Sequence, residues 1–250
     1  MGIRGMVFFA CGEIAWLKSN KEEVVLMSEE QKDSFEQKIY EVWLRAREQQ
    51  VDCVKEESTY ASEIKKQPGE YTLEDYYNLP EDVHAELIDG EFYYHGSPKS
   101  IHQRLSVSIL FSIENFIRKR KGKCIAFHAP LDVNLDCDDK TMLQPDILIL
   151  CDKNKLKKWG IYGHPDFCME IVSESSVRLD CVKKLQKYVD AGVKEYWILD
   201  PYRNVLMTYW WEDDYMPHVY PLSGKVGLKL YQEELTIDLD ELAEMIATTP

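Results

Sequence analysis

The pattern of hydrophobic residues predicts an α/β protein with a central mixed β-sheet flanked by α-helices and an N-terminal helical extension. Three observations lead to this prediction. Two long segments carry apolar residues at helical spacing, short apolar runs typical of buried strands lie between and after them, and an Asp-Gly pair indicates a hairpin. An order of helix, strands, helix, three strands, helix and strands is typical of helices packed on the faces of a mixed sheet.

The first part of the chain, residues 1–70, is predicted to be an extension of the core. Ser28 and Gln31 can form a capping box, and the helix that follows carries an apolar stripe. The stripe consists of Phe35, Ile39, Val42 and Ala46. The polar stretch 53–70 then serves as a linker. We therefore divide the chain into an extension (1–70), a core (71–211) and a C-terminal strand and helix extension packed on the core (212–250).

The core begins with local signals that are easy to place. Thr72 is a good N-cap for a short helix over 73–78, and Asp89-Gly90 is a hairpin turn between strands 85–91 and 92–95. Ser100 can cap a long amphipathic helix that stops near Gly122. Its buried stripe consists of Ile101, Leu105, Ile109, Ile113 and Ile117, widened by Leu110 and Phe116.

The second half of the core is predicted to consist mainly of strands. The predicted strands are 124–135, 142–151, 167–173, the hairpin 195–200 with 205–211, and one or two more within 219–238. We expect a loop over 153–165 and a helix over 176–191 that Gly192 ends. Asp238 can cap a last short helix.

Composition places the chain among ordinary soluble proteins. It has 250 residues, 45% hydrophobic and 30% charged, and no apolar run reaches the ~18 residues that span a bilayer. The seven cysteines are scattered without zinc spacing, so we expect small hydrophobes at Cys124, Cys151 and Cys168 and a reducing, cytoplasmic location. The apolar start, 1–16, carries Glu13 and lacks the cleavage site of a signal peptide.

The net charge of -14 argues against casual binding of nucleic acid. However, residues 71–199 hold 17 basic and 20 acidic side chains, so most of the acidic excess lies outside this part. Basic clusters at 118–123, 153–158 and 178–187 can serve as solvated faces or as contacts to a DNA backbone.

Two acidic residues stand in apolar runs, where an unpaired charge costs several kcal/mol. Asp146 follows Pro145 at the start of one predicted strand, and Glu170 lies in the middle of another. If these strands are neighbours, the two carboxylates can approach one cation. Mg²⁺ accepts few carboxylates and also binds phosphate oxygens, so the pair is typical of a metal-dependent nuclease.

The helix after Glu170 adds a lysine to this candidate site. Asp180, Lys184 and Tyr188 recur every four residues, so they lie along one helix face. Lys184 can point toward Glu170, where it would orient the attacking water and stabilise charge. Lys183 and Lys187 are the competing lysines, and Lys183 is turned about 100° away.

Five stretches together resemble the Uma-type restriction-endonuclease-like family of the PD-(D/E)xK nuclease superfamily. They are AELIDGE (85–91), SPKSIHQRL (97–105), QPDILIL (144–150), MEIVSESS (169–176) and DCVKKLQKYVDAGVKEYWILDP (180–201). The resemblance implies a restriction-endonuclease-like core with a mixed sheet flanked by helices. It covers roughly residues 71–211, and its specificity comes from the order and spacing of the pieces.

The resemblance implies a role for individual residues. It assigns Glu86 as the first acid, Asp146 as the aspartate of the PD motif and Glu170 as the second strand acid. The usual strand lysine is replaced by Val172, and the Uma-type pattern moves it to Lys184 on the next helix. These catalytic residues would use Mg²⁺ or Mn²⁺, and the metal ligands would be Asp146, Glu170 and Glu86.

Further positions are accessory candidates. His102 and Gln144 match family positions, and His102 is either a proton carrier, a DNA contact or a packed helix residue. Asp180 and Tyr188 join the accessory set, while the other five histidines, among them His95, are expected to be structural or exposed. Candidate nucleic-acid contacts are Lys99, Arg104, Arg178 and Lys187.

The leading hypothesis from the sequence is a metal-dependent endonuclease that cuts DNA phosphodiester bonds with a metal-activated water. The alternative is a catalytically inactive relative that serves as a binding or assembly module, which the net charge favours. A nuclease acting on RNA or on branched or damaged substrates is a third possibility. Tyr76-Tyr77, the N-terminal helix and the aromatic segment 209–211 offer surfaces for a homodimer.

Overall fold

The computed structural model describes residues 7–10, 13–16, 66–173, 176–177 and 179–249. The chain divides into two compact units, Met1–Glu48 and Gln49–Pro250. In the first unit, β1 (Val7–Ala10) pairs antiparallel with β2 (Glu13–Trp16). The predicted N-terminal helix and most of the linker lie outside the described residues.

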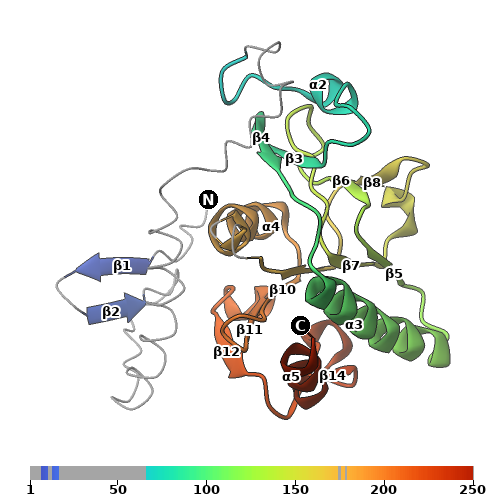
Figure 1. Ribbon diagram of the computed structural model, residues 1–250, viewed down its shortest axis with the longest axis vertical. Coiled ribbons are helices and arrows are strands. Elements are labelled where there is room, and N and C mark those ends of the chain that lie inside the picture. The colour runs from blue at the N-terminus through green and yellow to red at the C-terminus, as the bar shows by residue number, and fades with distance from the viewer. Residues whose placement is uncertain (1–6, 11–12, 17–65, 174–175, 178, 250) are drawn as a thin grey trace. The chain divides into compact units, whose positions relative to one another are not determined.

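The second unit is built on a mixed sheet of six strands in the order β12-β11-β10-β9-β7-β5 (Figure 1). β9 and β10 are parallel, and the other neighbours are antiparallel. The strands are β5 (Ile125–His128), β7 (Ile147–Leu150), β9 (Phe167–Ile171), β10 (Glu195–Asp200), β11 (Val205–Trp210) and β12 (His218–Pro221). The predicted α/β class with a central mixed sheet is therefore confirmed.

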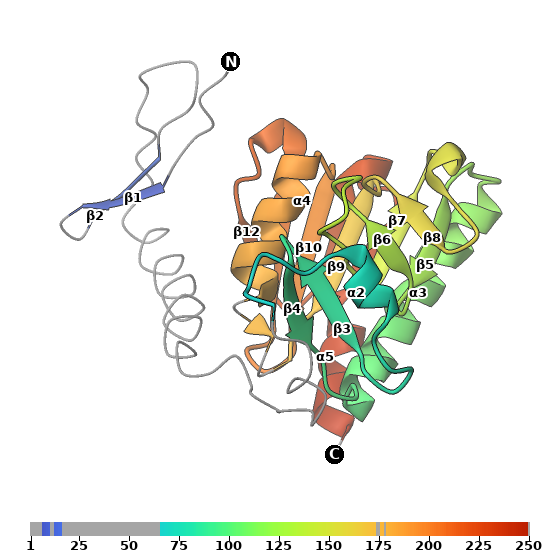
Figure 2. The same ribbon diagram turned by 90° about the horizontal axis from the view of Figure 1, so that it is seen from above.

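Helices cover both faces of this sheet (Figures 1 and 2). α3 (Ser100–Lys119) and α5 (Leu239–Thr248) lie on one face, and α4 (Leu185–Ala191) lies on the other. The face toward α3 and α5 carries alternate strand residues such as Met169 and Trp197, which pack into one buried apolar cluster. Glu170, one position on, therefore faces α4.

Segments with clear local signals in the sequence form the expected structures. α2 (Leu73–Tyr77) begins at a capping box between Thr72 and Asp75. The hairpin of β3 (Ala85–Ile88) and β4 (Glu91–Tyr94) turns at Asp89 and Gly90, with φ angles of 51° and 75°. Two positive φ angles are what a tight hairpin turn with right-handed strand twist requires. Asp238 accepts a hydrogen bond from the Glu241 amide at 3.2 Å and caps α5.

Several predicted element bounds were wrong. The strand expected over 124–135 is two strands, since Pro130 has no N–H for a continuous ladder. Its second half, β6 (Asp132–Asn134), pairs with β8 (Gly160–Tyr162) inside the expected loop. The tail forms three strands, β12, β13 (Lys225–Gly227) and β14 (Thr236–Asp238). Lys99, rather than Ser100, is the N-cap of α3.

Another wrong bound concerns the helix expected over 176–191. Leu179–Lys184 forms a π-helix, and α4 follows it from Leu185. Gly192 ends α4 with a φ of 85°, as predicted. π-helical turns are rare and are frequently found at functional sites. This one presents Asp180 and Lys184, which are both buried.

The interpretation of Cys124 and Cys151 as small hydrophobes was also wrong, because they form a disulfide. Cys124 precedes β5 and Cys151 follows β7. Ile125 and Leu150 are partners in the ladder, so the two cysteines are the next facing pair. Cys168 is a buried free thiol, as expected. Among the described helices, none combines the length and apolar character that crossing a membrane requires.

Candidate active site

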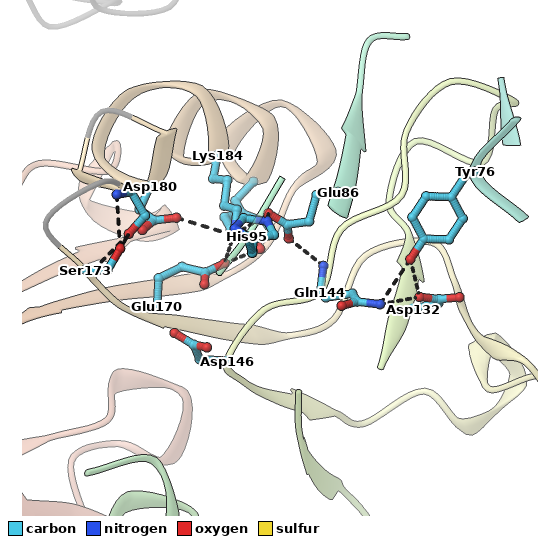
Figure 3. Close-up of polar contacts among 12 residues, drawn as sticks. Tyr76, Glu86, His95, Asp132, Gln144, Asp146, Glu170, Ser173, Asp180 and Lys184 are labelled. Carbon is cyan, nitrogen blue, oxygen red and sulfur yellow. Dashed lines mark hydrogen bonds and ion pairs between the residues drawn. The ribbon is translucent and has the colours of Figure 1, made fainter. Parts of the chain in front are cut away.

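Adjacent strands bring the two central acids together. Ile147 on β7 is paired with Met169 on β9, so Asp146 and Glu170 occupy the next facing positions of the ladder. Glu170 is almost fully buried, whereas the Asp146 side chain is 15% exposed. Figure 3 shows both carboxylates at this end of the sheet. The expectation that these strands are neighbours is correct.

The Lys184 ammonium lies among three carboxylates (Figure 3). Its Nζ is 2.8 Å from Glu86 Oε2, 3.0 Å from Glu170 Oε1 and 3.3 Å from Asp180 Oδ1. The side chain is only 4% exposed. Burial lowers its pKa, but the three carboxylates outweigh burial and hold the pKa well above its usual value. Lys184 therefore remains a cation.

Glu86 is the best-bonded acid of the cluster. Its Oε1 accepts a hydrogen bond from the Gln144 amide at 2.6 Å, and its Oε2 lies 3.0 Å from His95 Nε2 as well as near Lys184. Burial raises the pKa of Glu86, but the charge of Lys184 and the bonds to His95 and Gln144 lower it to about 2. Glu86 is therefore an anion at neutral pH.

Glu170 and Asp180 are less well compensated. Glu170 Oε1 accepts hydrogen bonds from Tyr188 Oη at 2.9 Å and from Lys184. Burial raises the pKa of Glu170 well above its usual value and also raises that of Asp180, and Lys184 offsets this only in part. One ammonium cannot neutralise three carboxylates, so this site favours a further positive charge.

Asp146 is held from the opposite face of the sheet. Its Oδ2 lies 3.0 Å from His102 Nε2 and accepts a hydrogen bond from the Ile171 amide at 2.7 Å. Burial lowers the pKa of His102, but the hydrogen bond and charge of Asp146 raise it above its usual value. His102 therefore fixes the direction of the Asp146 carboxylate. The sequence had left three roles open for His102, as a proton carrier, a DNA contact or a packed helix residue, and in the structure it orients another candidate site residue.

Gln144 belongs to a second polar network beside the cluster. Its side-chain Nε2 donates to Asp132 Oδ1 at 2.8 Å and to Tyr76 Oη at 3.0 Å, and Tyr76 donates to the same Asp132 oxygen at 2.8 Å. These bonds fix the Gln144 side chain, and the Gln144 amide in turn holds Glu86. The network ties α2, β6 and the segment before β7 to the site (Figure 3).

The contacts of the three candidate lysines differ. Lys184 is the one that reaches Glu86 and Glu170. Lys183 pairs with Glu91 at 2.7 Å near the surface, and Lys187 pairs with Asp89 at 2.7 Å and with Asp136.

The candidate nucleic-acid contacts lie elsewhere. Lys187 is neutralised by its two acidic partners, Lys99 lies 5.4 Å from the centre of the Tyr202 ring, and Arg104 donates to Thr249. Arg178 lies outside the described residues.

His95 is the site residue that the sequence interpretation missed, because it was taken as structural or exposed. A signal for it exists in the hairpin. An Asp89-Gly90 turn places Glu86 opposite Tyr93, as observed, so His95 is the diagonal neighbour of Glu86 on the same hairpin face. Long side chains at such diagonal positions can touch.

The donor set suits a hard divalent cation held by two protein groups. In the described residues, no three His, Cys, Asp or Glu side chains are arranged to hold a metal ion. Asp146 and Glu170 nevertheless supply two carboxylates on facing positions, and Glu170 lacks sufficient compensating charge. Mg²⁺ commonly takes one or two carboxylates and completes its shell with water and phosphate.

Comparison with known proteins agrees with this geometry. The family model described as "Uma2: Putative restriction endonuclease" matches residues 73–240, which include the whole cluster. The chain belongs to the Uma2 family. No curated protein matches the chain significantly.

A solved structure has a fold similar to that of this chain. It is described as a putative nuclease belonging to DUF820 from Anabaena variabilis, and it is 18% identical. The match has a TM-score of 0.58 and covers 70% of this chain and 98% of the other. At this identity the likeness concerns the fold alone.

Proposed function

We propose that this Uma2 protein is a metal-dependent endonuclease that hydrolyses DNA phosphodiester bonds. The observation that carries the proposal is the buried Lys184 ammonium held by Glu86 and Glu170, next to Asp146 at the end of the neighbouring strand. Membership of the family whose model is described as "Putative restriction endonuclease" supports the same chemistry. A cation and paired carboxylates at one point suit a phosphoryl centre, which gathers negative charge as water attacks.

In this proposal, Asp146 and Glu170 hold Mg²⁺ or Mn²⁺. Bound there, the ion would activate water and neutralise charge on the scissile phosphate. Glu86 was predicted as a third ligand, but both its oxygens are bonded to Gln144, Lys184 and His95. We therefore assign Glu86 to positioning Lys184 rather than to the metal.

The protein groups have separate tasks. Lys184 orients the attacking water and stabilises the developing charge, while Asp180 and Glu86 fix its ammonium. His102 directs the Asp146 carboxylate, and Tyr188 directs that of Glu170 through a 2.9 Å hydrogen bond. Such outer contacts commonly affect metal affinity by ~10–100-fold.

One observation favours a second candidate, an inactive nuclease fold used for binding or assembly. Lys184 already has three anionic partners within the protein, and candidate DNA contacts such as Lys187 are paired with acids. A net charge of -14 also suits protein partners better than DNA.

A nuclease assay with Asp146→Asn separates the two candidates. Asparagine keeps the size and the bond to the Ile171 amide but removes the charge. Wild-type protein should cut DNA with Mg²⁺ or Mn²⁺ and stop with EDTA, and the variant should lose roughly 100-fold or more of this activity. Asp240→Asn, at an exposed acid in α5, should stay within about two-fold of wild type.

The substrates should include supercoiled, linear, single-stranded and branched DNA, and RNA. If wild-type protein cuts none of these substrates with either metal, the enzyme proposal is wrong and the binding module remains. Activity on RNA alone would show that the protein is a nuclease acting on RNA. Equal cutting by the Asp146 variant would show that the site has been assigned to the wrong residues.

A further inference from the structure

The outer face of α3 carries apolar side chains that the core does not cover. Leu105, Ile109 and Ile113 point into the core and are buried, whereas Val107 is 61% and Phe111 is 70% exposed. Residues four apart on a helix are neighbours, so Val107 and Phe111 form one contiguous patch. Phe111 is more exposed than the other large hydrophobic residues of the described chain, which makes this patch the strongest candidate for a contact surface.

A groove between α3 and α5 extends this patch. Its lining is Gln103, Arg104, Val107, Ser108, Phe111 and Met245. Two contacts cross between the helices and fix the groove, from Ser108 Oγ to Glu241 Oε1 at 3.2 Å and from Arg104 to Thr249. The two helices lie side by side on the same face of the sheet (Figure 1). An apolar centre with a polar rim is the usual anatomy of a protein interface.

We propose that this face binds the same face of a second copy of the chain, with α3 packed antiparallel on the α3 of the other copy. The two-fold axis crosses the exposed side of α3 at the level of Ile109 along the helix. A two-fold contact pairs residue i with j and j with i. Val107 and Phe111 lie equally far from Ile109 on either side, so each Val107 meets the other copy's Phe111. The aromatic ring of one copy then enters the groove of the other.

The charges on α3 fit this antiparallel arrangement. Arg104 and Glu114 also lie equally far from Ile109, so each arginine meets a glutamate of the other copy. Glu114 Oε2 already pairs with Arg118 on its own helix at 2.7 Å, and its Oε1 accepts a long hydrogen bond from the Ala126 amide at 3.4 Å. Each carboxylate oxygen can accept a further bond, so Glu114 can still pair with a second cation. A parallel arrangement would place Arg104 against Arg104 and Glu114 against Glu114, and like charges across an interface are unfavourable.

The expected dimer is weak. α3 has 20 residues and is therefore about 30 Å long, and one helix face with an adjoining groove covers less than the ~800 Å² per partner of a standard interface. We expect dissociation constants in the micromolar range. This surface differs from those suggested by the sequence, since Tyr76 is bonded to Asp132 inside the polar network. It is independent of the proposed catalysis.

Sedimentation velocity of the full chain from about 1 to 200 µM tests the proposal, since this range brackets a micromolar constant. The mass should rise from one chain toward two, and Phe111→Glu should abolish this rise. Arg104→Glu and Glu114→Lys should each weaken association by ~10-fold, and the double variant, which exchanges the charges, should recover most of it. Trp211→Glu, at an aromatic residue that is 46% exposed, is the matched control and should dimerise normally.

The proposal is overturned if wild-type chain stays monomeric throughout, or if Phe111→Glu dimerises like wild type. The latter result would place any dimer contact elsewhere, for example on the N-terminal segment. Failure of the double variant to regain association over both single variants would remove the antiparallel pairing. Thermal unfolding of each variant excludes misfolding as the cause. The melting temperatures should stay within a few degrees of wild type, because Arg104 and Phe111 are exposed and Glu114 is only partly buried.

Discussion

At the scale of single residues, Lys184 is the most informative position. It is buried and holds three acidic groups that come from β3, β9 and the π-helix. A buried ion pair is not by itself evidence of stability, because desolvation cancels much of the attraction. Removing one partner is a different matter, since it leaves uncompensated charge in the interior.

Lys184→Met should therefore lower the free energy of unfolding by about 3 kcal/mol or more. The neighbouring Lys183→Met removes a partly exposed ion pair to Glu91 and should cost less than about 1 kcal/mol. Urea unfolding of both variants at pH 7 measures the difference. Equal losses would show that the three carboxylates do not depend on Lys184.

Glu86 gives a prediction about pH. Folding lowers its pKa from 4.5 to about 2, so the unfolded chain binds the extra proton between these values and folding stability falls as pH drops through them. The stability advantage of wild type over Glu86→Gln should be largest above pH ~4.5 and shrink toward pH ~2. Glu212→Gln, at an exposed position, is the control in the same urea titrations. An advantage that is constant across this range would contradict the ionised state of Glu86.

At the scale of elements, the β3–β4 hairpin and the π-helix determine where the site forms. The hairpin presents Glu86 and His95 on one face, and the π-helix presents Asp180 and Lys184. Short sequence signals predicted the hairpin correctly, because an Asp-Gly turn is a local preference. The change from α- to π-helix has no comparable local signal.

The Asp89-Gly90 turn can be tested with two alanine substitutions. Gly90 has a φ of 75°, and a Cβ there would lie 2.5 Å from the Gly69 carbonyl oxygen, whereas Gly224 has a φ of 74° and open space around it. Gly224→Ala should cost about 1 kcal/mol for the backbone conformation, and Gly90→Ala should cost at least about 1 kcal/mol more. Thermal unfolding compares them. Equal melting temperatures would mean that the 66–70 segment does not pack on the hairpin as described.

At the scale of the whole molecule, the sheet separates two tasks. One face forms the large apolar core with α3 and α5, and the other faces the polar cluster and α4. Asp146 lies at the end of β7, where His102 reaches it from α3. Asp146 and Glu170 therefore lie where the apolar core ends and the polar cluster begins.

The Cys124–Cys151 disulfide joins β5 to β7 across 27 residues of sequence. Constraining a loop of this length in the unfolded chain should stabilise the fold by about 2–4 kcal/mol. Wild-type protein should thus unfold at lower urea concentration in dithiothreitol. The double variant Cys124→Ser and Cys151→Ser should show this loss without reductant and no further change with it. If dithiothreitol does not change the urea concentration at which wild-type protein unfolds, the result argues against the disulfide. The cytoplasmic location inferred from the scattered cysteines stays a prediction.

The sequence by itself determined the fold class, the hairpin, the caps of α2 and α5, and the positions of Asp146 directly before one buried strand and of Glu170 within another. These features depend on hydrophobic period and on side chains that act within a few residues, so they can be read locally. Only the tertiary structure decided that His102 reaches Asp146 from α3, that the lysines beside Lys184 turn to surface acids, and that two cysteines bond. Each of these contacts joins separate elements, and its existence depends on how the sheet packs, which no local pattern encodes.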